Sequence, residues 1–139
     1  MYVIDTNVIS ELRKVRSGKA HPRVQDWAAS VSSGEMFLSS ITIEELEHGV
    51  LLLERSDPRQ GAILRRWLDE SVMTAFDGRI LPVDTDVARR AAALHVPNPA
   101  PFRDSLIGAT ALVHQMTVVT HNTKDFAGFL GLDLIDPWA

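Results

Sequence analysis

Four acidic side chains follow apolar runs of this 139-residue sequence or open helix-like segments. Asp5 directly follows the first apolar run, Glu45 comes shortly after the second, Asp104 opens a helix-like segment, and Asp125 follows a late valine-containing run. If these carboxylates converge they repel, because two charges ~4 Å apart cost about 4 kcal/mol at an effective dielectric of about 20. A hard divalent cation, Mg²⁺ or Mn²⁺, would offset that repulsion. The sequence therefore predicts a metal site.

Hydroxyl and amide side chains accompany these acids. Thr6 follows Asp5, and Thr120 and Asn122 come at the end of the valine-containing run. In open parallel sheets, ligands bind beyond the carboxyl ends of the strands, which is where these residues fall. We expect them to orient the carboxylates or to contact a substrate. A divalent ion held there would lower the pKa of a bound water and so activate it as a nucleophile.

Each acid also has a purely structural interpretation. Asp5 is suited to cap a following helix, and Thr42-x-x-Glu45 has the spacing of a capping box. Asp104 and Asp125 would be favoured near helix N-termini by the helix dipole. These roles explain the acids one at a time, but they do not explain why all of them fall at the same predicted edge of a sheet.

The elements that must position these residues alternate along the chain. Short runs rich in valine and isoleucine predict buried strands at 2–4, 36–38, 80–83, 118–120 and 134–135. Helical spacing predicts helices over 8–15, 22–31, 43–55, 58–75, 87–95 and 102–115. Such alternation indicates an α/β fold with a central parallel sheet of four to five strands and helices on both faces. The length fits one domain over residues 1–139.

Composition narrows the possible function classes. The chain has no cysteine, which excludes disulfides and zinc–thiolate sites, and it has neither a glycine-rich phosphate loop nor a nucleophile elbow. No signal peptide or membrane-length apolar run is visible, so we expect a cytoplasmic protein that does not contact a membrane. The formal net charge of −4 argues against a simple nucleic-acid binder. One basic run, 13–23, would either be a solvated loop or grip phosphates.

Five sequence blocks, in this order, resemble those of PIN-domain ribonucleases, especially VapC-type toxins of the FitB-like branch. They are VIDTNVIS near the N-terminus, LSSITIEELEHGV, FRDSLIGATA, VTHNTKDF and a closing DPW. Each block is weakly specific, whereas the ordered set spans nearly the whole chain. The resemblance implies a three-layer α/β/α sandwich that binds Mg²⁺ or Mn²⁺ through Asp5, Glu45 and Asp104.

One position departs from this pattern. In the FitB-like pattern a fourth acid often stands where this chain has Asn122, an uncharged amide. Asp125, one helical turn further on, would supply the missing carboxylate and is counted here among the catalytic candidates. Whether one or two ions bind stays open on the sequence.

The resemblance also implies a biological setting. It implies an endoribonuclease that is the toxin of a VapBC-type toxin–antitoxin module, held by a cognate VapB-like antitoxin. RNA is the implied substrate. A homodimer is expected, with higher-order assembly when the antitoxin is bound.

Two other functions stay open on the sequence. A degenerate PIN domain would bind RNA or a partner without cutting it, and Asn122 is the best support for that alternative. A haloacid-dehalogenase-like phosphatase is suggested by the D-x-D-x-[TV] pattern at 84–87, although little chain remains for that family's other motifs.

Overall fold

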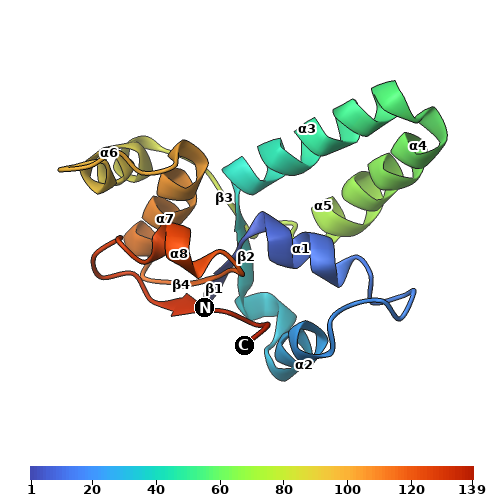
Figure 1. Ribbon diagram of the computed structural model, residues 1–139, viewed down its shortest axis with the longest axis horizontal. Helices are drawn as coiled ribbons and strands as arrows, with labels where there is room; N and C mark the ends of the chain where they lie inside the picture. The colour runs from blue at the N-terminus through green and yellow to red at the C-terminus, as the bar shows by residue number, and fades with distance from the viewer.

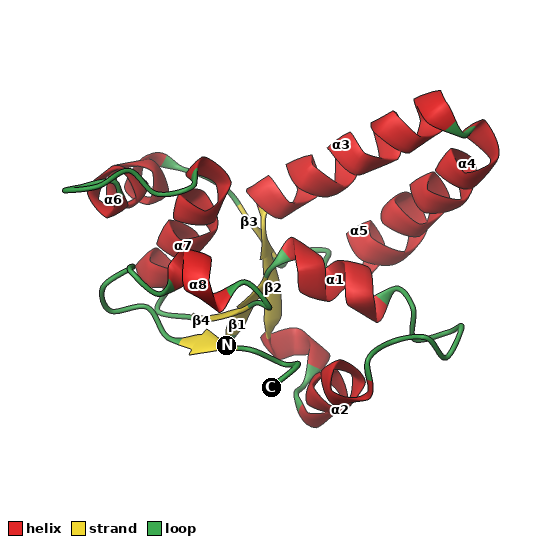
Figure 2. Cartoon of the chain, viewed as in Figure 1, coloured by secondary structure: helices red, strands yellow, loops and turns green.

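The computed structural model describes residues 1–139 and contains one five-stranded sheet. All strand pairs are parallel, and the strand order is β3–β2–β1–β4–β5. The strands are β1 (Tyr2–Ile4), β2 (Met36–Ser39), β3 (Ile80–Leu81), β4 (Thr117–Val119) and β5 (Leu134–Ile135). Helices lie on both sides of the sheet (Figure 2). The predicted three-layer α/β/α fold is confirmed.

The helices account for most of the remaining chain. They are α1 (Thr6–Leu12), α2 (Pro22–Ser30), the 3₁₀ turn η1 (Ser33–Glu35), α3 (Ser40–Ser56), α4 (Pro58–Arg66), the π-helical segment η2 (Trp67–Val72), α5 (Met73–Ala75), α6 (Thr85–Leu94), α7 (Phe102–His114) and α8 (Thr123–Phe126). None is long and apolar enough to cross a membrane.

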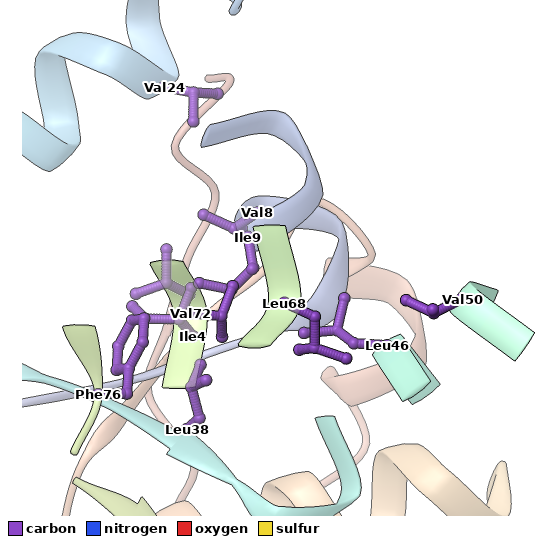
Figure 3. Close-up of a cluster of buried hydrophobic side chains, with 11 residues drawn as sticks. Ile4, Val8, Ile9, Val24, Leu38, Leu46, Val50, Leu68, Val72 and Phe76 are labelled. Carbon is purple, nitrogen blue, oxygen red and sulfur yellow. The ribbon is translucent and has the colours of Figure 1, made fainter. Parts of the chain in front are cut away.

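Alternation along β1 explains why helices cover both faces of the sheet. Val3 and Ile4 are both fully buried, and successive strand residues point to opposite faces. Ile4 packs in a cluster with α1, α2, α3 and the η2–α5 segment, as Figure 3 shows for Val8, Leu46 and Val72. Val3 packs on the other side, against residues of α7 and α8 such as Ile107 and Phe126.

The helices α3 and α4 form a hairpin that extends away from the sheet (Figure 1). Arg65 of α4 joins the two helices, since its guanidinium donates to Glu47 at 2.8 Å and to Glu54 at 3.1 Å. Gly61 lies against α3 so closely that an added Cβ would overlap the backbone of Glu54. The absence of a side chain at Gly61 therefore permits this close packing.

The sequence prediction of one helix over 58–75 is only partly right. The structure divides this segment into α4, the π-helical turn η2 and α5. The apolar stripe continues through the π-helical turn, where Leu68 and Val72 are both buried. A pattern of buried residues does not distinguish an α-helix from one wider turn, which is why the sequence did not reveal it.

The order of the strands fixes where a site can form. The chain runs from β1 outward to β2 and β3, then returns to place β4 on the other side of β1. The strand order reverses between β1 and β4, and the carboxyl ends of the strands at such a switch point are the usual ligand position in open α/β sheets. Asp5 and Thr120 directly follow these strands.

Candidate active site

Asp5 lies at the carboxyl end of the central strand and is 5% exposed. It is the N-cap of α1, and its Oδ1 accepts a hydrogen bond of 2.8 Å from the backbone N–H of Thr6. Its Oδ2 accepts from the hydroxyl of Thr120 at 2.7 Å and from the amide of Asn7 at 3.2 Å. Burial nevertheless raises the pKa of Asp5, and the nearby charge of Asp125 adds to the rise. The capping role of Asp5 therefore does not exclude a role in the candidate site.

Glu45 lies near Asp5 from α3, although not through the capping box that its spacing suggested. The N-cap of α3 is Ser39, whose hydroxyl accepts from the N–H of Ile41, so Thr42 is inside the helix rather than at its cap. The carboxylate of Glu45 instead accepts a hydrogen bond of 3.2 Å from the hydroxyl of Thr6. Burial raises the pKa of Glu45, and the charge of Asp5 raises it further.

Asp104 is the third residue of α7 and is partly buried. Burial raises its pKa to about 6, and the charges of Asp5, Asp125 and Glu45 contribute in that order. Three acids that are distant in sequence therefore act electrostatically on Asp104. The helix dipole alone would stabilise its charged form, so the raised pKa shows that burial and repulsion dominate here.

Asp125 and Asn122 lie beyond the carboxyl end of β4. Asp125 lies in the short helix α8 and is exposed, and its charge raises the pKa of both Asp5 and Asp104. Asn122 is exposed as well, and its backbone N–H donates to the hydroxyl of Thr120 at 3.0 Å. Thr120 thus connects Asn122 to Asp5.

The donor set suits a hard divalent cation in its chemistry. The groups that face one another are carboxylates and hydroxyls, which are oxygen ligands of the kind that Mg²⁺ and Mn²⁺ prefer. The pKa values of Asp5, Glu45 and Asp104 are all raised, in each case partly by another carboxylate. No group of three or more such side chains is drawn tightly enough together to enclose an ion. The cluster therefore fits a cation by its ligand type and its charge. Its carboxylates are further from one another than in a closed metal site.

Two features of this region were not predicted from the sequence. The amide of Asn7 donates to Asp5 and lies 3.4 Å from the hydroxyl of Thr120, while its carbonyl accepts from the backbone N–H of His121 at 3.2 Å. The ring of His121 lies 4.4 Å from that of Trp138, and its Nδ1 is 3.4 Å from Asp136. A signal was present in both cases, because Asn7 falls within the block VIDTN and the pair Asp136 and Trp138 belongs to the closing block DPW.

Asp84, the first acid of the phosphatase-like pattern, has a structural role. It is the N-cap of α6, and its carboxylate accepts from the N–H of Val87 at 3.0 Å. It follows β3, an edge strand, whereas Asp5 follows the central strand. The position of Asp84 gives no support to a phosphatase site.

A central parallel sheet with acidic residues beyond the carboxyl ends of its strands is typical of open α/β proteins that bind a ligand at the switch point, and the family comparison places the chain more narrowly. The PIN domain model matches residues 2–129. This chain belongs to the PIN domain family, as the ordered blocks indicated.

Particular relatives refine the comparison. The chain is 36% identical to VapC ribonuclease Y4jK from Sinorhizobium fredii, covering 99% of this chain and 98% of that protein. It is 35% identical to Toxin FitB from Neisseria gonorrhoeae, covering 99% of each.

Solved structures show the same architecture. The crystal structure of FitAcB from Neisseria gonorrhoeae matches with a TM-score of 0.88 and 34% identity, covering 99% of both chains. A toxin-antitoxin complex from Klebsiella pneumoniae matches with a TM-score of 0.67 and 26% identity, covering 99% of this chain and 98% of that chain.

Proposed function

We propose that this protein is a metal-dependent endoribonuclease and the toxin of a toxin–antitoxin module. The observation that carries the proposal is the carboxylate cluster at the β1–β4 switch point, where burial and mutual repulsion raise the pKa of Asp5, Glu45 and Asp104. A fold retains such a cluster when a cation offsets the repulsion. The ribonuclease and toxin relatives, each matched over nearly the full chain, support the same function.

In this proposal Asp5, Glu45 and Asp104 hold Mg²⁺ or Mn²⁺, and Asp125 completes the acidic rim. When bound, such an ion activates water and stabilises the negative charge that develops at the phosphate. Thr120 and the backbone of Thr6 fix the carboxylate of Asp5, and the hydroxyl of Thr6 orients Glu45. Asp104 loses its proton near pH 6, so it is a carboxylate at neutral pH. Asn122, tied to Thr120, is placed to contact the RNA or the ion through its carbonyl oxygen.

The charge-removing substitution Asp5→Asn tests this function. It keeps the shape of the side chain while removing its charge, and Asp104→Asn does the same at the second proposed ligand. We expect either change to lower cleavage of single-stranded RNA in Mg²⁺ or Mn²⁺ by more than the roughly 100-fold typical of losing a supporting group. Asp26→Asn, at an exposed position of α2, is the matched control and should cut normally.

Full activity of Asp5→Asn or Asp104→Asn would contradict the assignment. Binding of RNA with no cleavage by the unaltered protein in either metal would instead favour a PIN domain that binds without cutting. That second candidate rests on Asn122, which stands where the resemblance often places a fourth acid.

The same proposal includes the partners and the assembly. The Klebsiella pneumoniae neighbour is a toxin-antitoxin complex, which supports a cognate VapB-like antitoxin for this chain. We propose that residues 1–139 form one domain that acts in the cytoplasm and dimerises. Light scattering of the purified protein tests the dimer, and a mass equal to one 15.4 kDa chain at all concentrations would exclude it.

A further inference from the structure

A pocket of about 340 Å³ lies beside the acidic cluster and is not used by the function proposed above. One wall is the loop between α6 and α7, with Pro97, Asn98 and Pro99, and the other is α8 and the turn after it, with Lys124, Asp125 and Gly128. Figure 1 shows this loop following α6 at one end of the molecule. The volume falls within the range of about 300–1,000 Å³ that is usual for pockets that bind small ligands. We call it the proline pocket.

The loop wall of the proline pocket is held in place by His95. The Nδ1 of His95 accepts a hydrogen bond of 3.0 Å from the backbone N–H of Ala100, and its Nε2 lies 3.0 Å from the hydroxyl of Ser105. That hydroxyl donates to the carbonyl of Phe102 at 2.6 Å. These contacts require the neutral tautomer with its proton on Nε2. Together with the three prolines of the loop, they fix the wall before any ligand arrives.

The proline pocket adjoins the proposed cleavage centre. Asp125 lines it and also raises the pKa of Asp104 and Asp5 by its charge. Ser105, which holds His95, directly follows Asp104 in α7. A group bound in the pocket would therefore lie next to a phosphate placed at the carboxylates.

The lining suits a nucleoside. Proline and alanine provide flat apolar surface for the face of a base, Asn98 offers an amide for its hydrogen-bonding edge, and Lys124 offers a cation for a phosphate. Asn98 and Lys124 are both exposed, so their polar groups are accessible to a ligand. Proteins bind unpaired RNA nucleotides by contacts to the base face, hydrogen bonds to the base edge and cations at the phosphate. Here proline and alanine take the place of the aromatic side chains that usually contact the base face.

We propose that the proline pocket binds one unpaired nucleoside of the RNA next to the bond that is cut, and that it thereby sets the sequence preference of cleavage. This proposal rests on the proposed ribonuclease function. It assigns Asn98 as a specificity-determining residue and Lys124 as a phosphate-binding residue, and it leaves the carboxylates to the reaction itself.

The test adds a large side chain at Gly128, one of the residues that line the proline pocket. Gly128 has no positive φ, and a Cβ built on it meets no atom within 4 Å, so the side chain of Gly128→Leu starts in open space. Gly49 on the exposed side of α3 is also free of neighbours within 4 Å, which makes Gly49→Leu a matched control. Thermal unfolding of both variants verifies that they are folded.

Cleavage sites are mapped on a random pool of short single-stranded RNA. We expect Gly128→Leu to lose about tenfold in kcat/KM at the preferred sites, the effect of one stacked base, and Gly49→Leu to match the unaltered protein. Asn98→Ala, a change that leaves the pocket open, should broaden the base preference at one position while total cleavage of the pool stays close to normal.

A second measurement separates failure of the pocket from failure of the nuclease. Fluorescence anisotropy follows binding of the same RNA pool in the Asp5→Asn background, where cleavage is not needed. Adding Gly128→Leu should weaken this binding about tenfold. If the unaltered protein does not cut RNA, the nuclease proposal fails and binding still decides on the pocket. Unchanged cleavage pattern and unchanged RNA affinity in Gly128→Leu would overturn the pocket proposal, even if antitoxin binding were lost.

Discussion

At the scale of single residues, Asp5 is both a helix cap and the most buried acid of the proposed metal site. Capping α1 fixes one of its oxygens, and Thr120 and Asn7 fix the other. These hydrogen bonds stabilise the charged form, while burial opposes it more strongly and raises the pKa. Asp5 is therefore oriented and at the same time poorly solvated, which favours binding of a cation.

Residues that directly follow a strand were placed correctly from the sequence. Asp5, Thr6 and Thr120 were predicted to share one edge, and hydrogen bonds join Thr6 and Thr120 to Asp5. The helix cap at Ser39 was not predicted, because the spacing of Thr42 and Glu45 suggested a capping box there instead. Only the folded backbone shows that α3 begins after Ser39.

Thr42 provides a stability prediction. It is fully buried, and its hydroxyl has no hydrogen-bond partner. A buried hydroxyl without a partner costs about 1–3 kcal/mol. We expect Thr42→Val, which keeps the shape, to raise the free energy of unfolding by about 1 kcal/mol in urea denaturation.

Thr110 is the control for that prediction. It is also fully buried in a helix, but its hydroxyl donates to the carbonyl of Leu106 at 2.7 Å. Thr110→Val should therefore leave stability unchanged or lower it by up to about 1 kcal/mol. Equal effects at the two positions would show that the environment of Thr42 is satisfied in solution.

At the scale of elements, the strands were predicted well because each is a short apolar run between polar or turn-forming residues. The exact ends were less predictable. The run that predicted a strand at 80–83 forms only Ile80–Leu81, where β3 pairs with β2 alone at the edge of the sheet. A run of apolar residues does not show whether a strand pairs with one neighbouring strand or with two. An edge strand and a central strand therefore look alike in sequence.

The α3–α4 hairpin gives a prediction that contrasts two glycines. Gly61→Ala would place a methyl group on the backbone of Glu54, whereas Gly49→Ala would meet nothing within 4 Å. We expect Gly61→Ala to lower the free energy of unfolding by about 2 kcal/mol through overpacking. Gly49→Ala should raise it by up to about 1 kcal/mol, because alanine is the better helix former.

Chemical denaturation of both glycine variants measures the contrast. If Gly61→Ala were as stable as Gly49→Ala, the close contact between α3 and α4 would not exist in solution. Stability below that of the unaltered protein for both variants would point to a shared effect on α3 rather than to the contact.

At the scale of the whole molecule, stability depends on the charge of the acidic cluster. Asp104 has a pKa of about 6 in the folded protein and 3.8 as its ordinary value. Between these values the folded state binds more protons than the unfolded state, so stability falls as pH rises through this window. Above about pH 6 the full cost of the charged Asp104 is present.

Asp104→Asn should remove this cost. The rise in pKa corresponds to at most about 3 kcal/mol, and we expect about 1 kcal/mol because solvent screens a partly exposed carboxylate. In metal-free buffer, Asp104→Asn should therefore unfold at a higher temperature than the unaltered protein near pH 7.5, with a much smaller difference near pH 4. Added Mg²⁺ or Mn²⁺ should stabilise the unaltered protein and stabilise Asp104→Asn far less.

Asp26→Asn is again the control, since this exposed acid should change neither the pH dependence nor the response to metal. A metal response that is the same in Asp104→Asn and the unaltered protein would place the ion elsewhere. A pH profile unaffected by Asp104→Asn would show that the cluster is well solvated in solution.

The hydrogen bond from Thr120 to Asp5 joins residues that are 115 positions apart. As a ribosome makes the chain, Asp5 emerges early, while its closest partner is synthesised near the end. β4, which Thr120 directly follows, is also a late segment. A nascent or truncated chain that ends before this strand therefore lacks the hydroxyl that fixes the carboxylate of Asp5, and under the proposed function cutting would begin only once synthesis is nearly complete.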